Sequence, residues 1–256
     1  MKRYLALFLT VMLLFTGCAG KTEGVYYAPL DSAIIRTVSA GTGGSFLYTC
    51  LLYNETMYTS LTSFTTLDKS ELDLDHFLGN ELGTVYYGSV HWHDDPGTYG
   101  EGIIQGTLYQ IQGYDPAFRI CVYYEQKIGT DTYFCVKVFD CLNNITLNKG
   151  SDLFTDRLHL EDACQVTYKE SSLPLDGALL NPLLSAMNEA PFLNPSDETF
   201  QDLDSLASCP LIFTDKHGIQ TQITVYDGYA ALHQAGVDAM VVALDPQLCV
   251  NLFSEN

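Results

Sequence analysis

The chain has 256 residues, with 31 acidic side chains against 12 basic ones and a formal net charge of −19. A body this anionic repels phosphate backbones and anionic lipid headgroups, so the composition excludes nucleic acid as a partner and excludes a polybasic membrane contact. Because 47% of the residues are hydrophobic and the acidic residues are spread along the chain, the sequence predicts a folded protein and not an acidic tail.

The N-terminus has the features of an export signal. Lys2 and Arg3 provide its positive start, and an apolar run follows over residues 4–15. That run fits the hydrophobic region of a removable signal and is shorter than the about 20 residues that a spanning helix needs. The sequence therefore predicts a signal peptide over residues 1–17. Its removal leaves 10 basic side chains against 31 acidic ones, a net charge of −21.

The signal ends on Leu14-Phe15-Thr16-Gly17-Cys18, which resembles the lipobox of bacterial lipoproteins. The resemblance implies that Cys18 receives a thioether-linked diacylglycerol and becomes the first residue after cleavage. Two acyl chains, at about 0.8 kcal/mol per buried CH₂, anchor a protein stably where one chain does not. The expected location is therefore the extracytoplasmic face of the cell membrane, with residues 18–30 as lipidated cysteine and short tether. The alternative interpretations are a plain secretory signal, with Cys18 near the cleavage site by chance, and a cytosolic chain with an apolar start.

Residues 31–170 are predicted to form a β-rich domain. Asn54-Glu55-Thr56 separates two runs rich in apolar and aromatic residues, which indicates a hairpin. The acidic segment over residues 68–82 is interpreted as a solvated face, because it lacks the ligand spacing of a calcium loop. Antiparallel pairing of sequence neighbours is the default. Four further strands are expected in series, at residues 84–91, 107–112, 119–124 and 132–138.

Within this domain, three stretches are similar to a module of uncharacterised lipoproteins of Gram-positive bacteria. The similarity spans residues 46–140 and implies no activity, cofactor or catalytic residue. It supports the interpretation of an exported, anchored protein. The stretches are Tyr53-Asn54-Glu55 with Tyr58, Leu78-Gly79-Asn80-Glu81-Leu82-Gly83-Thr84-Val85, and Gly106-Thr107-Leu108-Tyr109-Gln110-Ile111-Gln112-Gly113-Tyr114-Asp115-Pro116-Ala117-Phe118-Arg119-Ile120.

A smaller α+β domain is predicted over residues 171–256. Apolar residues at helical spacing surround Pro182, which a helix tolerates only near its start, and Pro191 ends the pattern, so a helix is expected to begin at Asn181 and end before Pro191. Asp245-Pro246 supplies an N-cap and a first-turn proline for a terminal helix. The predicted fold class is α+β, with mainly antiparallel sheets, a few short helices and two consecutive sheet units. The strands expected in this domain are residues 211–214, 220–226, 229–233 and 238–244, with a hairpin tip at Asp215-Lys216-His217-Gly218.

Seven cysteines besides Cys18 form no C-x₂-C pair, so neither a zinc ribbon nor a redox pair is indicated. Several lie in apolar strand-like runs, where a free thiol behaves as a small hydrophobe, and we interpret them as reduced and buried. One bridge stays open as an alternative. If Gly129 lies near a hairpin tip, Cys121 and Cys135 are expected on the same face of paired strands.

The stretch His91-Trp92-His93-Asp94-Asp95 has metal-site chemistry. Alternate residues of a strand point to the same face, so His91 and His93 with the following Asp94 offer three ligands for zinc or copper. A polar loop entry is the alternative interpretation.

A group of aromatic residues in the same region is the candidate ligand-binding set. Tyr86, Tyr87, Trp92 and Tyr99 are close in the sequence and are able to form a platform for a glycan or a peptide. Packing of the tyrosines on a sheet is the alternative, because half-buried strand faces favour aromatic residues.

No motif in the sequence identifies a catalytic residue or a cofactor site. The sequence has no P-loop, no dinucleotide-binding glycine pattern, no nucleophile elbow and no HExxH zinc motif. The predicted function is that of a membrane-anchored extracytoplasmic lipoprotein, acting as a non-catalytic binding or envelope-associated module with a cell-wall glycan or an envelope protein as partner. The alternative is an envelope hydrolase or metal-dependent enzyme, which requires a cleft where a histidine and a carboxylate converge.

Overall fold

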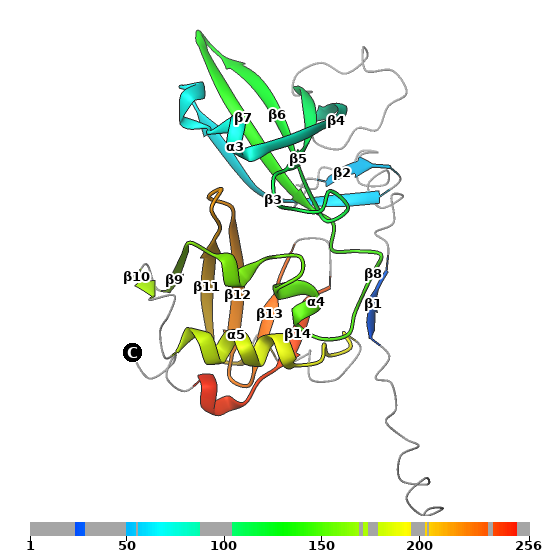
Figure 1. Cartoon of the computed structure of the whole chain (residues 1–256), viewed down its shortest axis with the longest axis vertical. Helices are drawn as coiled ribbons and strands as arrows, with labels where there is room; N and C mark the ends of the chain where they lie inside the picture. Colours follow the sequence, from blue (N-terminus) through cyan, green and yellow to red (C-terminus); the bar gives the residue numbers. More distant parts are fainter. Residues whose placement is uncertain are drawn as a thin grey trace, which may run out of the picture.

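The computed structural model of the chain describes residues 24–28, 50–54, 56–87, 104–168, 171–173, 179–195, 203, 205–234 and 238–249. Within these residues the strands form three antiparallel sheets, two with six strands and one with two. Figure 1 shows one large sheet above the other, with the two-stranded sheet at the side. The prediction of a β-rich antiparallel protein with few short helices is therefore confirmed. The number of sheets is matched only roughly, because a two-stranded sheet accompanies the two large ones where two sheet units were predicted.

The upper sheet in Figure 1 has the strand order β2-β3-β7-β6-β5-β4. The predicted hairpin at Asn54 is confirmed, because β2 and β3 pair on either side of it. Both faces of the central strands are buried, with Ile120 and Val122 on one face and Cys121 and Val138 on the other. The strands are β2 (Cys50–Tyr53), β3 (Thr56–Thr66), β4 (Leu78–Tyr87), β5 (Ile104–Ile111), β6 (Arg119–Ile128) and β7 (Asp131–Asp140).

The register between β6 and β7 determines whether Cys121 and Cys135 lie on the same face of the sheet. Gly129 has a positive φ of 64° and begins a two-residue turn, which makes Cys121 the partner of Val138. Cys135 lies three residues from Val138, so it points to the opposite face, and the expectation that Cys121 and Cys135 share a face is wrong. No disulfide joins the six cysteines whose side chains the structure describes. Five of them are buried as predicted and Cys164 is exposed, while their reduced state stays a prediction. These six are Cys121, Cys135, Cys141, Cys164, Cys209 and Cys249.

The lower sheet has the strand order β10-β9-β11-β12-β13-β14, and its last four strands follow one another as hairpins. The helix predicted to begin at Asn181 is confirmed as α5 (Leu180–Glu189), which has Pro182 in its first turn. Its Leu183 and Met187 are fully buried against one face of the sheet. The strands are β9 (Gln165–Tyr168), β10 (Ser171–Leu173), β11 (Ser208–Thr214), β12 (Gln220–Tyr226), β13 (Tyr229–Leu232) and β14 (Met240–Ala243).

Short elements complete the lower half. The 3₁₀ helix η2 (Leu160–Asp162) precedes β9, and α4 (Ser151–Phe154) packs beside α5. The predicted cap of a terminal helix is present, since Asp245 Oδ1 accepts a hydrogen bond of 2.9 Å from the Gln247 N–H and residues 246–249 are helical. Beyond residue 249 the predicted helix lies outside the described residues.

Two predicted boundaries differ from the structure. Strand β9 falls within residues 31–170, the range predicted for the first domain, but it pairs with β11 and β10 of the lower sheet, so the change of sheet precedes it. Part of the expected tether is also folded. Strand β1 (Val25–Tyr27) pairs with β8 (Ile145–Leu147), and Tyr27 is only 3% exposed in the core of the lower half. Burial of one aromatic side chain stabilises a short strand that sequence pattern alone does not reveal.

The tip of the β11–β12 hairpin joins the two large sheets. Asp215 Oδ1 accepts hydrogen bonds of 2.8 Å from the N–H groups of His217 and Ile219, which shapes the tip as predicted for these turn residues. Tyr114, from the upper sheet's β5–β6 connection, donates a hydrogen bond of 2.8 Å to Asp215 Oδ2. Ile219 is 1% exposed among buried side chains of the upper sheet, including Cys121.

A buried ion pair supports this junction. Arg119 and Asp140 face each other across β6 and β7, and the guanidinium donates to the carboxylate at 2.6 and 2.7 Å. Burial lowers the pKa of Arg119, but the charge and hydrogen bonds of Asp140 raise it by more, so the guanidinium stays charged. The Tyr114 ring lies over this guanidinium, with 4.5 Å between its centroid and Arg119 Cζ.

The ion pair generates the first prediction. Asp140→Ala leaves the Arg119 charge buried without its partner and should lower the free energy of unfolding by about 3–5 kcal/mol in denaturant titrations. The double variant Arg119→Met with Asp140→Leu should recover most of that loss, because no charge then stays buried. Asp131→Ala, at the exposed end of the same hairpin, is the control. Equal losses for single and double variants would contradict this account.

Candidate ligand-binding site

A segment between β3 and β4 folds back across one face of the upper sheet, and we call residues 67–77 the strap. It contains the 3₁₀ helix η1 (Lys69–Glu71) and the single turn α3 (Leu74–Phe77). Asp68 caps η1 by accepting hydrogen bonds from Ser70 at 2.9 Å from N and 2.7 Å from Oγ, which lowers the pKa of the Asp68 carboxyl. Phe77 is buried and holds the strap on the sheet.

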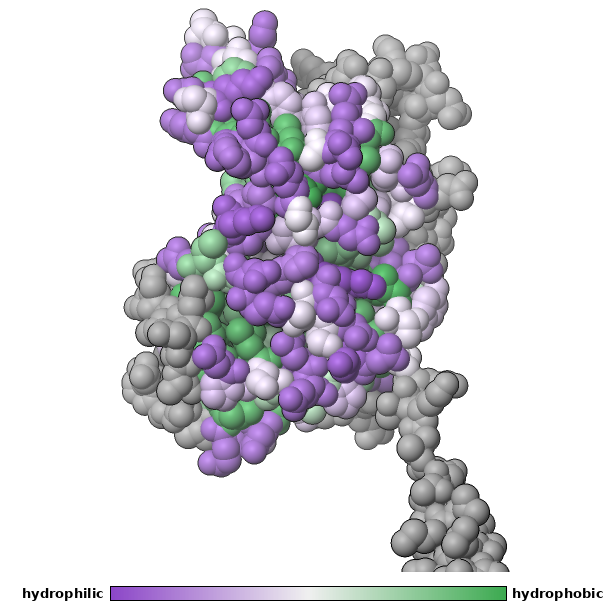
Figure 2. Space-filling model, in the orientation of Figure 1, coloured by the Kyte–Doolittle hydropathy of each residue, from purple (hydrophilic) through white to green (hydrophobic). Residues whose placement is uncertain are grey.

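The strap's acidic side chains face solvent, as the sequence predicts. Glu71, Asp73 and Asp75 are all exposed, and the face drawn in Figure 2 is largely hydrophilic. Leu72 and Leu74, between these acidic residues, pack toward the sheet. The alternation of acidic and apolar residues therefore gives the strap one solvated side and one packed side.

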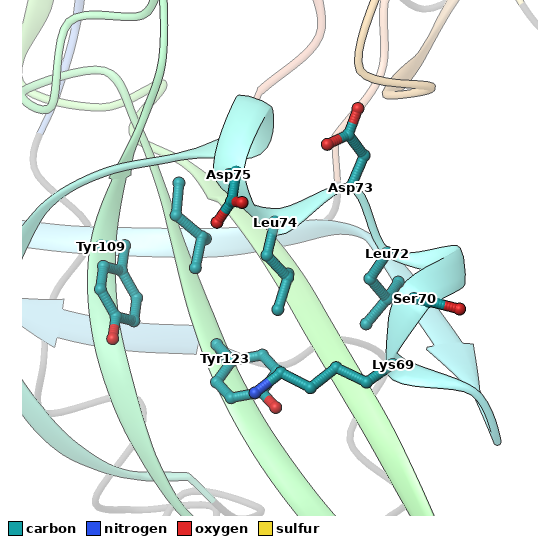
Figure 3. A pocket seen from close by; sticks show the side chains of 9 residues that line it. Lys69, Ser70, Leu72, Asp73, Leu74, Asp75, Tyr109 and Tyr123 are labelled. Carbon is teal, nitrogen blue, oxygen red and sulfur yellow. The ribbon is translucent and has the colours of Figure 1, made fainter.

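An open pocket of about 750 Å³ lies between the strap and strands β5 and β6 (Figure 3). Its aromatic residues are Tyr109 and Tyr123, which are on the same face of these neighbouring strands, since Tyr123 is opposite Thr107 in the register. Lys69, Ser70, Asp73 and Asp75 supply its polar groups. In Figure 3 the Asp73 carboxylate points away from the tyrosines.

Lys69 covers one of the two tyrosine rings. Its Nζ lies 5.2 Å from the centroid of the Tyr123 ring and 6.0 Å from that of Phe134. A hydrogen bond with the Tyr123 side chain raises the pKa of Lys69, and the Tyr123 hydroxyl donates to Glu125 Oε1 at 3.2 Å. The pocket thus places the Lys69 ammonium beside the Tyr123 ring, with the Tyr109 ring next to it.

A second pocket, of about 170 Å³, lies where the strap meets the tip of the β11–β12 hairpin, and we call it the junction pocket. Phe77 is its central aromatic residue, with ring centroids 5.8 Å from Phe64 and 5.4 Å from His217 in edge-to-face arrangements. His217 is fixed in turn, because its Nε2 hydrogen-bonds the Gln112 carbonyl at 2.9 Å.

A histidine and a carboxylate converge at the junction pocket. His76 Nδ1 lies 2.8 Å from Asp73 Oδ1, and both side chains line this pocket while remaining largely exposed, at 82% and 75%. The hydrogen bond and charge of Asp73 raise the pKa of His76. The imidazole therefore favours its charged form more than an ordinary histidine does, which suits an anion contact or an acid better than a base.

Of the residues that the sequence singled out, the structure describes Tyr86 and Tyr87. Tyr86 and Tyr87 are paired through their backbones at the end of β4, with Gln105 and Ile104 as partners. Among the described residues, no group of three or more His, Cys, Asp or Glu side chains is arranged to hold a metal ion. The others are outside the described residues, and their proposed roles stay predictions: Cys18, His91, Trp92, His93, Asp94 and Tyr99.

Sequence reasoning missed Tyr109 and Tyr123 as site residues. Each lies on a predicted strand, and two-residue alternation along β5 and β6 is the signal that places a tyrosine on one face of each. Their proximity depends on the β5–β6 register, and their exposure to a pocket depends on the strap folding back over them. Neither is encoded in a local pattern.

Comparison with protein-family models, curated proteins and solved structures finds no match to this chain. The helices that the structure describes include none with the length and apolar character to cross a membrane.

The Asp73–His76 contact generates the second prediction. Asp73→Asn removes the charge that raises the pKa of His76, so the pKa should fall toward the unperturbed value of about 6.5 in an NMR titration of the imidazole. The same contact makes the stability of the fold depend on pH. The pair stabilises the fold at pH values below the pKa that His76 has in the unfolded state, and this contribution is lost as the pH rises through the raised pKa of the folded state. Asp131→Asn is the distant control. An unchanged His76 titration in Asp73→Asn would refute the contact.

Proposed function

We propose that the protein is a lipid-anchored binding module of the extracytoplasmic membrane face, and that its open pocket binds a glycan of the cell envelope. The main support for a glycan ligand is the set of side chains that line the open pocket. It combines the rings of Tyr109 and Tyr123 with the ammonium of Lys69 and the carboxylate of Asp75, while the Asp73 carboxylate points away from the rings.

The anchor is supported by the lipobox-like end of the signal. Only six residues lie between Cys18 and the start of β1 at Val25, so the seven residue steps from one to the other span at most about 25 Å when extended. A body attached through this span stays close to the bilayer. Its net charge of −21 repels anionic headgroups, so the acyl chains are the part of the protein that holds it there.

The open pocket has the chemistry that sugar hydroxyls and sugar faces require. Apolar ring faces contact the C–H side of a sugar, while charged groups and the Ser70 hydroxyl donate to and accept from its hydroxyls. Its volume of about 750 Å³ falls within the usual range for ligand sites, and its wide mouth lets a polymer pass through. The acidic strap also favours glycans that carry amino groups.

A hydrolase is the second candidate, and one observation favours it. Asp73 contributes to both pockets, and its partner His76 is a histidine held next to a carboxylate at the edge of a pocket. A histidine with a raised pKa is able to protonate a leaving group. Cleavage of a bound glycan that disappears in His76→Gln, with binding retained, would favour this candidate over a binding module.

The third prediction concerns the anchor. The full chain expressed in a bacterium should fractionate with membranes, and Cys18→Ala should release it or leave it unprocessed, because the thioether-linked chains are then absent. Mass spectrometry of the wild-type N-terminal peptide should show a diacylglyceryl group on Cys18. Cys164→Ala, which removes an exposed thiol of the folded body, is the matched control and should stay with the membrane. Membrane retention of Cys18→Ala in processed form would overturn the anchor.

The fourth prediction concerns the open pocket. Tyr109→Ala should weaken binding of purified cell-wall glycan to the full chain by roughly 5- to 30-fold, which corresponds to the 1–2 kcal/mol of a contact residue. Tyr26→Ala removes an exposed tyrosine on β1, 57% accessible, and should leave binding unchanged. Pull-down and calorimetric titration measure both. If the two variants bind equally well, the pocket does not hold the glycan.

A further inference from the structure

We propose that the junction pocket binds a small zwitterion with an apolar side group, namely a free apolar or aromatic amino acid. This site is separate from the open pocket. It is built from both large sheets, because Phe64, Phe77 and Val136 belong to the upper half while Lys216 and His217 belong to the hairpin tip of the lower sheet.

The size and floor of the junction pocket fit an apolar side group. Its volume of about 170 Å³ is close to that of an apolar cavity of about 150 Å³ that holds a benzene molecule. Phe64, Phe77 and Val136 supply aromatic and aliphatic surface at its base. Gly218, whose positive φ of 78° shapes the tip, lies beside this floor, since a Cβ there would be in ordinary contact with the Phe64 ring at 3.7 Å.

Charges of both signs line the pocket. Glu71 and Asp73 come from the strap, where Glu71 accepts from the Thr66 hydroxyl and Asp73 pairs with His76. Each of these bonds uses part of a carboxylate's acceptor capacity, which leaves lone pairs for a ligand ammonium. The pocket therefore has a site for the positive group of a zwitterion on its strap side.

Lys216 provides the opposite charge from the hairpin tip. It is exposed, and the ion pairs found in the described part of the chain are His76–Asp73 and Arg119–Asp140, so Lys216 has no carboxylate partner there. A ligand carboxylate is the group that its ammonium would pair with. Glu71 and Asp73 are opposed by Lys216 and, where it is protonated, by His76, so the lining carries both signs of charge and matches a zwitterion better than a simple cation or anion.

Such a ligand contacts the strap and the hairpin tip at once. Since these belong to different sheets, the bound amino acid adds contacts across the junction and stabilises the folded chain by mass action. The inference does not depend on the glycan proposal, because its probe residue, Lys216, does not line the open pocket.

The test uses the full chain in detergent with L-phenylalanine, phenylalanine amide and N-acetyl-phenylalanine as probes. L-phenylalanine should raise the thermal unfolding midpoint and bind in calorimetric titration. The amide, which lacks the carboxylate, and the acetylated form, which lacks the ammonium, should each bind about fivefold or more weakly, as expected for loss of one exposed ion pair.

The exposed position of Lys216 allows a variant that keeps the fold. Lys216→Met should weaken L-phenylalanine binding by about fivefold and change binding of the amide little, because the amide has no carboxylate to lose a partner. Lys127→Met, at the exposed end of β6, is the matched control and should bind like the wild type. Equal binding of the acid and the amide, equal binding by both lysine variants, or no binding of L-phenylalanine at millimolar concentration would overturn the proposal.

Discussion

The hydrogen bond from Tyr114 to Asp215 is the interaction on which the arrangement of the molecule depends. It connects the upper sheet to the hairpin tip of the lower one, and each partner is itself held in place. Tyr114 lies over the Arg119 guanidinium, which is fixed by Asp140, and Asp215 accepts two backbone N–H groups of its own turn. Burial raises the pKa of Tyr114, so its hydroxyl keeps the proton that it donates. A network in which every member is satisfied gives one fixed geometry.

Both candidate pockets follow from this junction and from the strap. The hairpin tip forms one wall of the junction pocket, and the strap separates that pocket from the open one, with Asp73 lining both. Ile219 and Phe77 fill the space beneath, so the strap rests on a base made by both sheets. The polar residues of both pockets therefore lie on short connecting elements that a packed core supports. Binding residues commonly lie on such connecting segments of a rigid fold.

The sequence predicted the local elements well and their long-range arrangement poorly, for physical reasons. Hairpins such as β6–β7 are set by their own turns, so Gly129 is enough to place the reversal. The pairing of β9 with β11 spans dozens of residues and depends on burial of both strands under α5, which no local pattern records. The acidic strap is exposed as predicted, but its role in two pockets arises only because it folds back over β5 and β6. One residue of turn length likewise moved Cys135 to the face opposite Cys121.

The central claim is that the docked hairpin tip makes the two large sheets one cooperative unit. Native-state hydrogen exchange tests it directly at the Ile219 amide, which donates to Asp215 beneath the strap. The account predicts that this amide exchanges only through an opening as costly as that of the central strands β6 and β12. Exchange of the Ile219 amide through a much cheaper local opening, at a rate typical of an exposed loop, would contradict it.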